Sequence, residues 1–460
     1  MLAAAALAEG AVTGVVRKGP LTLLTLSDGA AEVSWLSDSS FRFTRCWQSA
    51  CLSRQDADAS VELKFREAAG ELIWETPYVR LRMKRGEVSL VVENAAEGTG
   101  FLSQGAVKRA APAGLEVTLT PAAEARLYGL NAGKMDVRGE VAETAAPFLM
   151  SAAGYGLHFG MPGMYRFDLT AGIAVRNIQA RQWEQFFYYG PTPKEILEEH
   201  HAVRGAIRNP KLGDLRGKPD YGRNVRGFGE LAAASMSGVL VPLVADELAW
   251  KSFAPGPEWD WYLYTYLCEA RDRGLPVIRP LAMQYPEDAE GALLTDEFLL
   301  GDEVLVAAGQ RTYLPRGVWT DLRTGERHRG RQWVETPAPP RLFARNGTIL
   351  PMLAGEVTEL HYFPKLGAEF FLSEPPAGDF ISQMHAGPAG DILRLEIEAK
   401  AERRYEWVVH HVPDASAVTA VGGDPPPWRY DPVKRELRVP AAAAEGANVI
   451  LNVTLGGPLD

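Results

Sequence analysis

Hydrophobic and polar residues alternate along most of the first 190 positions of the chain. Clear examples are LTLLTLSDG (21–29), VRLRMKRGEVSLVV (79–92) and LEVTLTP (115–121), with Gly or Asp-Gly turn signals at several breaks. A period of two places apolar side chains on one face of a strand and polar side chains on the other. Because no helical spacing of useful length interrupts this region, the pattern predicts a large antiparallel β-sandwich over residues 12–189.

The pattern changes at FFYYGPTPKEILEEHHAVRG, residues 186–205. Four consecutive aromatic residues indicate the buried end of a strand, and the Gly and Pro residues that follow end it. Thr192 and Glu195 have the spacing of a capping box, in which the Thr hydroxyl and the Glu carboxylate satisfy free backbone N–H groups. An apolar stripe begins at Ile196, so we predict a helix over residues 194–204.

The next hundred residues have the pattern of a short α/β segment. Residues 205–229 are rich in glycine and have little apolar spacing, which predicts a loop. SGVLVPLVADE (237–247) is continuously apolar, as expected of a strand covered on both faces. WDWYLYTYLCEARDRG (259–274) predicts a deeply packed helix that ends at Gly274.

Strand patterns return near Phe298 and continue to the end of the sequence. RTYLPRGVWTDLRTGE (311–326) and RLFARNGTILPM (341–352) indicate strands joined by tight turns, and the last 85 residues indicate a further small sandwich. The sequence therefore predicts a mainly β, multidomain chain. Its predicted parts are residues 1–189, 190–297, 298–375 and 376–460.

Composition narrows the possible partners. The 460 residues carry a formal net charge of −10 without a basic stripe, which argues against nucleic acid. No segment approaches the roughly 20 apolar residues of a membrane-spanning helix, so we expect a soluble chain without a membrane partner. The first residues, MLAAAALAEGAV, lack the positive segment of a signal peptide. The compartment stays undecided, with a cytoplasmic location favoured over a secreted one.

The three cysteines define neither a metal site nor a disulfide framework. Cys46, Cys51 and Cys268 lack the spacing of either. A single Cys46–Cys51 bridge would fit the spacing, but we expect reduced, packed cysteines.

Several motifs occur in the order typical of one family. RLYGLNAG (126–133) is similar to a Tyr-Gly-Leu-Gly-Glu turn, although Asn131 stands where a glycine is usual, and PFLMSAAGYGLHF (147–159) is similar to Pro-Phe-Phe-x-Ser-x-x-Gly-Tyr-Gly. The Gly-Pro-Thr-Pro junction at 190–193 and the segment 262–308 complete the series. With these motifs the chain resembles glycoside hydrolase family 31, the α-glucosidase and α-xylosidase family.

The resemblance implies a particular architecture. Residues to about 189 would form a galactose-mutarotase-like N-terminal β-sandwich, the helix after Gly190 would introduce a (β/α)8 catalytic barrel, and C-terminal β-sandwich domains would follow. Such a barrel takes about 250 residues. Between Gly190 and Phe298 the chain has roughly 110 residues, so we predict a truncated barrel remnant, for which a partner chain or an oligomer could supply the missing part.

Family chemistry requires two catalytic aspartates, one as nucleophile and one as acid/base. The Trp-x-Asp-x-Asn-Glu segment that carries the nucleophile is absent between residues 190 and 298. Alignment of YGRN (221–224) with the Gly-Asp-Asn turn of the acid/base places Arg223 at its position, unless this stretch is an unrelated surface turn. A guanidinium has no proton to donate at any useful pH. We therefore predict no catalytic residue.

Two residues are candidates for sugar binding. Asp246 resembles the family aspartate at the C-terminal end of a late barrel strand, where barrel sites lie, although it could simply cap that strand. Trp250 could stack on a sugar ring, whereas Trp261 is expected in the core. The remaining carboxylates of the segment are expected to be solvated charges: Asp214, Asp220, Glu230, Glu247, Glu258 and Asp260.

Other chemistry is not indicated. His200 and His201 point about 100° apart on a helix, so they are expected to be surface or junction residues, and no metal site or cofactor is predicted.

The sequence leaves three functional hypotheses for the chain. The chain is a degenerate family member with a carbohydrate-binding or structural role, an active retaining α-glycosidase with a rebuilt site, or the product of an internally deleted gene. The partner implied is an α-glucoside or α-xyloside.

Overall fold

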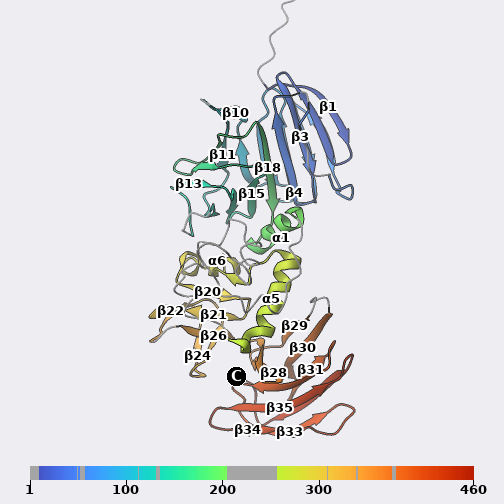
Figure 1. Cartoon of the computed structure of the whole chain (residues 1–460), viewed down its shortest axis with the longest axis vertical. Helices are drawn as coiled ribbons and strands as arrows, with labels where there is room; N and C mark the ends of the chain where they lie inside the picture. The colour runs from blue at the N-terminus through green and yellow to red at the C-terminus, as the bar shows by residue number, and fades with distance from the viewer. Residues whose placement is uncertain are drawn as a thin grey trace, which may run out of the picture. The chain divides into compact units, whose positions relative to one another are not determined.

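The computed structural model describes residues 10–48, 50–51, 57–111, 113–130, 135–204, 256–307, 309–337, 340–375 and 380–459. These residues fall into two compact units, 10–204 and 256–459. Figure 1 shows that strands dominate both units. The predicted mainly β fold class is confirmed, while the division into four parts stays a prediction.

The first unit contains one helix, α1 (Pro193–Arg204), among its described residues. Its strands are β1 (Val12–Lys18), β2 (Leu21–Leu26), β3 (Gly29–Trp35), β4 (Ser40–Cys46), β5 (Lys64–Ala68), β6 (Glu71–Glu75), β7 (Val79–Lys84), β8 (Leu90–Asn94), β9 (Gly100–Gln104), β10 (Lys108–Arg109), β11 (Leu115–Pro121), β12 (Leu127–Gly129), β13 (Val141–Thr144), β14 (Phe148–Ser151), β15 (Tyr155–Phe159), β16 (Tyr165–Asp168), β17 (Ile173–Asn177) and β18 (Gln182–Tyr189).

These strands form two sheets whose apolar faces share one core. The first sheet has the order β1-β2-β3-β4-β18-β15-β14-β12, and the second has the order β13-β16-β17-β11-β9-β8-β7-β6-β5, with β10 paired to β11. Buried side chains from both sheets, among them Trp35, Trp74, Leu119 and Phe187, form one cluster. This arrangement follows from the alternating pattern, because each strand turns its apolar face inward.

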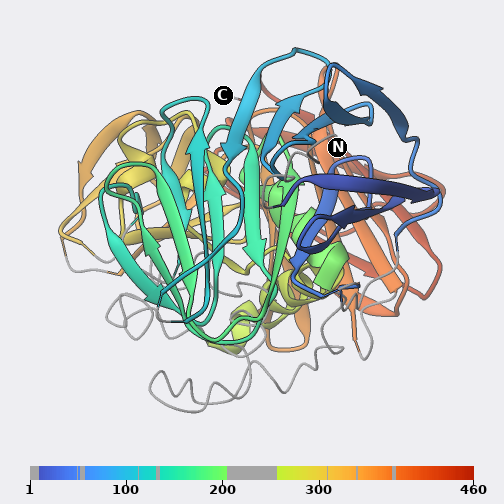
Figure 2. The same cartoon turned by 90° about the horizontal axis from the view of Figure 1, so that it is seen from above.

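Strand β18 lies beside β4 although the two are far apart in sequence. Residues 182–188 pair antiparallel with residues 40–46, and Figures 1 and 2 show the green end of the unit next to its blue beginning. Phe186, Phe187 and Tyr188 are buried. The aromatic run before the junction is therefore the buried strand end that its sequence predicts.

The capping box at the start of α1 is also confirmed. The backbone N–H of Thr192 donates to Glu195 Oε2 at 2.9 Å, and the backbone N–H of Glu195 donates to the hydroxyl oxygen of Thr192 at 3.4 Å. Ile196 and Leu197 are buried. Helix α1 therefore begins where the sequence predicts and uses the predicted apolar stripe.

The sequence places His200 either at the surface or at a junction between elements, and the structure shows the junction. His200 is buried, and its ring lies 4.5 Å from that of Phe148 and 5.2 Å from that of Tyr188, both in edge-on contact. The imidazole fills the apolar contact between α1 and the first sheet. His201 is partly exposed.

The second unit contains the helices α5 (Asp260–Arg273) and α6 (Leu281–Gln284) and the short 3-10 helices η2 (Pro257–Trp259) and η3 (Gly291–Leu293). Its strands are β19 (Ile278–Arg279), β20 (Glu297–Leu300), β21 (Val304–Ala307), β22 (Arg311–Leu314), β23 (Val318–Asp321), β24 (Arg327–Arg329), β25 (Gln332–Glu335), β26 (Arg341–Arg345), β27 (Thr348–Ala354), β28 (Val357–Phe363), β29 (Ala368–Glu374), β30 (Phe380–Ala389), β31 (Ile392–Glu398), β32 (Arg403–Val409), β33 (Ala415–Ala420), β34 (Arg429–Asp431), β35 (Glu436–Ala443) and β36 (Asn448–Leu455).

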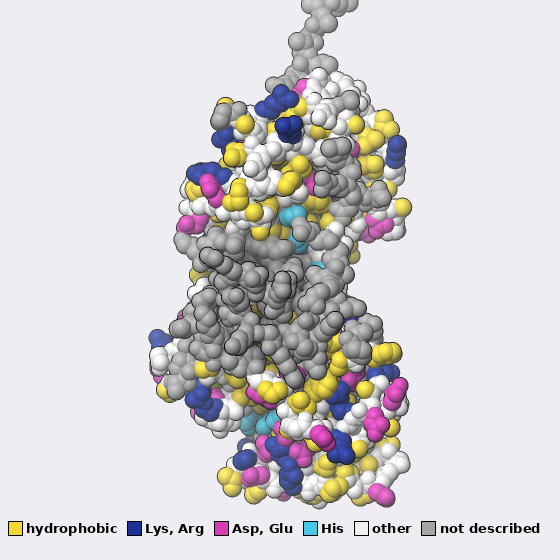
Figure 3. Space-filling model, in the orientation of Figure 1, with side chains coloured by type: hydrophobic (Ala, Val, Ile, Leu, Met, Phe, Trp, Pro, Cys, Tyr) yellow, Lys and Arg dark blue, Asp and Glu magenta, His cyan; other side chains and the backbone are white. Residues whose placement is uncertain are grey.

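These strands form a small sheet region followed by a sandwich. The first sheet has the order β19-β20-β21-β26-β23-β24, beside the hairpin β22-β25, and the sandwich pairs the sheets β27-β28-β32-β35-β34 and β29-β30-β31-β36-β33. Helix α5 packs on β27 and β29, where the ring of Tyr262 stacks 6.0 Å from that of Phe370. On the face seen in Figure 3, acidic and basic side chains are interspersed over this unit.

Helix α5 ends as the sequence predicts. Gly274 adopts a left-handed conformation with φ of 69°, and its N–H bonds to the carbonyl of Ala270. Among the helices of the described residues, none is long and apolar enough to cross a membrane.

Candidate functional site

The residues singled out for substrate contact lie outside the described residues. This holds for Asp246, Trp250 and Arg223, and also for Asn131 in the RLYGLNAG turn.

Two of the carboxylates that are expected to be solvated charges in the predicted barrel remnant, residues 190–297, are among the described residues. Glu258 is partly exposed, whereas Asp260 is buried at the start of α5, so the expectation of a solvated charge is wrong for Asp260. A carboxylate at a helix N-terminus is favoured by the helix dipole.

Trp261 is partly buried rather than fully in the core. The guanidinium of Arg403 lies 3.9 Å from the centre of its indole ring. This cation–π contact occupies the side chain. We therefore do not place Trp261 in a sugar site.

A groove in the first unit offers a binding site among the described residues. It consists of a cavity of about 840 Å³ and a smaller one of about 370 Å³, and Trp47 and Arg109 line both. We call the two cavities together the Trp47 groove. The larger cavity has the size typical of small-molecule sites. Sequence reasoning missed this groove, since the walls of its larger cavity alone come from four separate segments that only the sheet pairing brings together.

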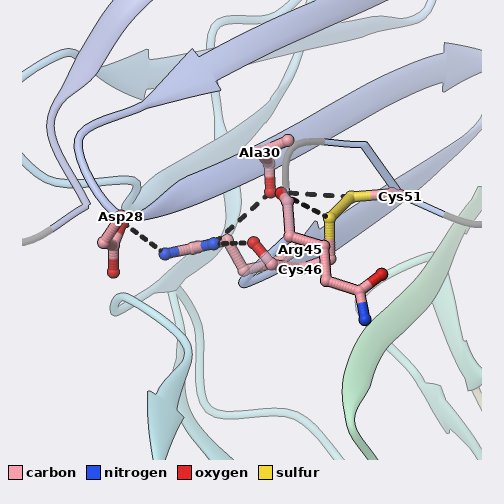
Figure 4. The surroundings of a disulfide bond; sticks show 6 residues. Asp28, Ala30, Arg45, Cys46 and Cys51 are labelled. Carbon is pink, nitrogen blue, oxygen red and sulfur yellow. Dashed lines mark hydrogen bonds and ion pairs between the residues drawn. A yellow bond between two sulfur atoms is a disulfide. The ribbon is translucent and has the colours of Figure 1, made fainter.

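One wall begins where β4 ends and is held by a disulfide. Cys46 and Cys51 are bonded, with their Cα atoms 5.5 Å apart, a normal separation for such a bridge (Figure 4). Beside them Arg45 donates to Asp28 at 2.7 Å and to the carbonyls of Ala30 and Cys46. The expectation of reduced cysteines is therefore wrong for this pair, because the two Cα atoms lie close enough for their sulfurs to bond.

The disulfide gives a simple prediction. The chain has three cysteines, and Cys268 is free and buried. Protein denatured without reductant should expose one thiol to a thiol-specific dye, rising to three after reduction. A Cys268→Ser variant should expose none before reduction. Three reactive thiols in unreduced protein would contradict the bridge.

The other walls of the groove are fixed by backbone contacts. The N–H of Ala110 bonds to the carbonyl of Gly114 and closes the β10–β11 hairpin. Gly114 has φ of +99°, and a Cβ there would lie 2.4 Å from the carbonyl oxygen of Asn177, so only glycine fits. The side chain of Asn177 accepts from the N–H groups of Gln179 and Ala180 and donates to the carbonyl of Pro162.

Glu184 lies at the far side of the larger cavity. A Cβ at Gly160 would lie 2.1 Å from Glu184 Oε1, so the carboxylate occupies the space that a side chain would fill. Burial raises the pKa of nearby Tyr165 to about 12, and the charge of Glu184 adds to this shift. Tyr165 therefore stays protonated and donates to the carbonyl of Met161 at 2.8 Å. Its hydroxyl fixes the loop that forms this wall.

The groove has the chemistry of a binding site rather than that of a retaining glycosidase. Such enzymes use two carboxyl groups about 5–5.5 Å apart. Among the residues that line the larger cavity, Glu184 is the one carboxylate. Within the described part of the chain, no group of three or more His, Cys, Asp or Glu residues is placed to hold a metal ion.

The carboxylates beside α5 are bound in a network instead. Buried Arg279 donates to both Glu269 and Asp302, and the hydroxyls of Tyr262 and Tyr266 lie 2.7 and 2.5 Å from Glu303 Oε2. Burial opposes the charge of Arg279, but the charges of Glu269 and Asp302 outweigh it and raise the pKa of Arg279. Burial also raises the pKa of Glu303. This network joins α5 to the following sheet.

Comparisons with known proteins find a matching domain and several relatives among the α-glucosidases. Residues 274–350 match the glycosyl hydrolase family 31 C-terminal domain. Alpha-glucosidase 2 of Bacillus thermoamyloliquefaciens is 28% identical over 216 residues, which cover 40% of this chain and 27% of that protein. Neutral alpha-glucosidase AB of Mus musculus is 37% identical over 102 residues, 20% of this chain and 11% of that protein. The matched stretches therefore span less than a third of these relatives.

Solved structures share the fold. A family 31 dextranase of Flavobacterium johnsoniae, complexed with isomaltotriose, has a TM-score of 0.78 at 13% identity and covers 97% of this chain and 99% of that chain. The α-xylosidase of Xanthomonas citri has a TM-score of 0.66 at 10% identity, covering 96% and 99%. At such identities the likeness shows the fold, which is that of multidomain glycoside hydrolases. Together with the α-glucosidase relatives and the matched domain, these findings support the assignment of the chain to glycoside hydrolase family 31.

Proposed function

We propose that this chain is a family 31 protein of carbohydrate metabolism that binds carbohydrate without α-glycosidase turnover. The observation that carries the proposal is the short segment between Gly190 and Phe298. It has roughly 110 residues, where a (β/α)8 barrel takes about 250. It also lacks the Trp-x-Asp-x-Asn-Glu segment that, by the resemblance, would carry the nucleophilic aspartate. The chain would then keep the β domains of the family around a barrel remnant.

Two further observations support the loss of hydrolysis. Arg223 stands where the alignment places the acid/base aspartate, and its guanidinium cannot act as a general acid. The described carboxylates beside α5 are engaged with Arg279 and two tyrosines, and they stabilise structure there. We propose Asp246 and Trp250 as sugar contacts of the remnant and the Trp47 groove as a second binding site.

The alternative functions predict different sites, assemblies or behaviour of the protein. An active retaining α-glycosidase with a rebuilt site would need two facing carboxylates, for which Asp246 and its neighbours are candidates. A barrel supplied by a partner chain would give a stable hetero-oligomer. The product of an internally deleted gene would bind no sugar and would express poorly in soluble form.

Turnover and binding can be measured on the same preparation. We expect no release of aglycone from chromogenic α-glucosides or α-xylosides, because the two catalytic carboxylates are missing. Calorimetry with the same sugars should show binding. An intact family 31 α-glucosidase serves as the positive control for each substrate. Catalytic release above the rate of a buffer blank would refute the loss of hydrolysis, and absence of both turnover and binding would refute the binding role.

A further inference from the structure

The Trp47 groove contains two arginines that form no ion pair with a carboxylate of the described residues. The guanidinium of Arg109 lies 5.3 Å from the centre of the Trp47 ring, and both Arg109 and Arg181 line the larger cavity. Neither arginine has an ion pair within the described residues, and both are exposed. Two full positive charges are therefore available to a molecule that enters the groove.

The neighbouring Arg45 differs from Arg109 in that a carboxylate neutralises its charge. Arg45 packs against the same indole, 4.4 Å from its centre, but its charge is met by Asp28 at 2.7 Å. Arg109 packs on the indole without such a partner among the described residues. A cation–π contact orients a guanidinium while leaving its hydrogen-bond donors free for a planar anion. Trp47 thus fixes the direction of Arg109 without neutralising it.

The charge balance of the larger cavity is opposite to that of the chain. Arg109 and Arg181 contribute two positive charges and Glu184 one negative charge, whereas the whole chain has a net charge of −10. The cavity therefore carries a net positive charge in an acidic protein, which favours anionic ligands near the two arginines. A neutral sugar would gain nothing from this arrangement.

The groove is also larger than a simple anion requires. Its cavities of about 840 and 370 Å³ share Trp47 and Arg109 in their walls. The side-chain amides of Gln48 and Gln182 and the apolar surface of Met161 and Pro162 complete the larger one. Amides bind hydroxyl groups, and apolar surface packs against sugar rings. A charged sugar fits these walls better than an isolated ion.

We propose that the Trp47 groove binds an acidic saccharide, with Arg109 and Arg181 contacting its anionic group. This proposal rests on the carbohydrate-binding role above and specifies its ligand class. The anionic group can be a carboxylate, a sulfate or a phosphate, because an arginine fork matches the oxygen geometry of all three. Glu184 and the two amides would contact hydroxyl groups.

Calorimetry of the full chain tests the proposal with matched ligands. Methyl α-glucoside and methyl α-glucuronide differ by one carboxylate, and glucose 6-phosphate presents a phosphate on the same ring. We expect the two acidic sugars to bind about tenfold more tightly than the neutral one at low salt, since charge-assisted bonds to arginine are the stronger kind. The preference should fall as salt is added.

Substitutions locate the effect. Arg109→Gln and Arg181→Gln should each reduce the preference for acidic sugars several-fold, and the double variant should abolish it. Arg17→Gln is the matched control, because Arg17 is also exposed and packs on a ring, that of Phe65 at 4.6 Å, but does not line the groove. All three positions are exposed, so the variants should fold, which circular dichroism and melting temperature check.

Each other outcome has a definite meaning. Equal affinity for the glucoside and the glucuronide overturns the acidic specificity and leaves sugar binding intact. Inorganic phosphate bound as tightly as glucose 6-phosphate overturns the saccharide part. Loss of preference in Arg17→Gln overturns the placement in the groove. Failure of every sugar to bind overturns both proposals, whereas turnover of aryl α-glycosides overturns only the loss of hydrolysis.

Discussion

Replacement of Arg279 by methionine should destabilise the second unit by about 3 kcal/mol. Arg279 is fully buried, and its guanidinium donates to Glu269, to Asp302 and, through Nε, to the carbonyl of Pro276 at 2.8 Å. Methionine fills similar space but leaves the two carboxylates without their partner. Removing one member of a buried ion pair costs about 3–5 kcal/mol. The lower end applies because Glu269 and Asp302 keep 18% and 26% of their side-chain surface exposed and can be partly hydrated.

The measurement is thermal unfolding followed by circular dichroism. For a unit of about 200 residues, a loss of this size lowers the melting temperature by roughly 10 °C. Arg273→Met is the control, because Arg273 pairs with the same Glu269 at 2.8 Å but is 53% exposed. An exposed helix pair contributes about 0.3–0.5 kcal/mol. Similar melting temperatures for both variants would contradict the structural role given to Arg279.

Replacement of Glu297 by glutamine should stabilise the protein, and the gain should grow with pH. Glu297 on β20 is 3% exposed and accepts from the N–H of Tyr313 at 3.1 Å. Burial raises the pKa of Glu297 from its usual 4.5 to about 9, against the opposing effect of the Tyr313 hydrogen bond. The folded state therefore keeps the carboxyl protonated where the unfolded state ionises it.

The sign follows from proton linkage. Between pH 4.5 and 9 the unfolded chain binds fewer protons than the folded one at this group, so stability falls as pH rises through that window. The change is up to about 1.4 kcal/mol per pH unit. Glutamine does not ionise, and its carbonyl can accept the same N–H. We expect Glu297→Gln to match the parent protein near pH 4.5 and to be more stable by about 2 kcal/mol or more at pH 8.

Urea unfolding at pH 5, 6.5 and 8 measures this difference. Glu335→Gln serves as the control, because its side chain is 79% exposed in the same part of the chain and should show no trend with pH. A stability gain that is the same at all three pH values would point to packing rather than ionisation. A loss at pH 8 would show that Glu297 is charged and stabilising in the folded state.

Local sequence signals predicted the elements that local chemistry determines. The Thr192–Glu195 capping box needs only the spacing of two side chains, and both of its backbone hydrogen bonds form. Gly274 ends α5 in the left-handed conformation that other residues avoid. The alternating runs became strands because each has one apolar face to bury. These features depend on neighbours within a few positions, so a single sequence suffices.

Features that depend on distant segments were missed. His200 looks polar in sequence, yet α1 turns it onto Phe148 and Tyr188, which come from strands β14 and β18. The Cys46–Cys51 bridge depends on the close approach of the two Cα atoms, for which the spacing of the cysteines in sequence gives no proof. The Trp47 groove is assembled by the pairing of β4 with β18 and of β10 with β11. A basic residue in a loop gives no hint that it faces such a cavity.

For the candidate barrel residues, the sequence prediction cannot be compared with the described part of the structure. Asp246 and Arg223 were selected by resemblance and Trp250 for its ability to stack on a sugar ring, and all three lie outside the described residues. The resemblance is strongest where residues carry structure, as in the segment 274–350 that matches the family domain and contains Arg279 and Asp302. The residues shared in this segment stabilise the β domains. They point to the family but do not establish a reaction.

The pairing of β4 with β18 has a consequence for synthesis of the chain. Cys46 leaves the ribosome roughly 140 residues before its neighbour Gln182, which at about 5–20 residues per second amounts to roughly 7–28 seconds. During this interval one edge of β4 has no native neighbour, and unpaired edges invite association with other chains. Nascent chains are therefore most exposed to aggregation while the middle of the first sheet waits for its last strand, and a chaperone that covers that edge should raise the yield of folded protein.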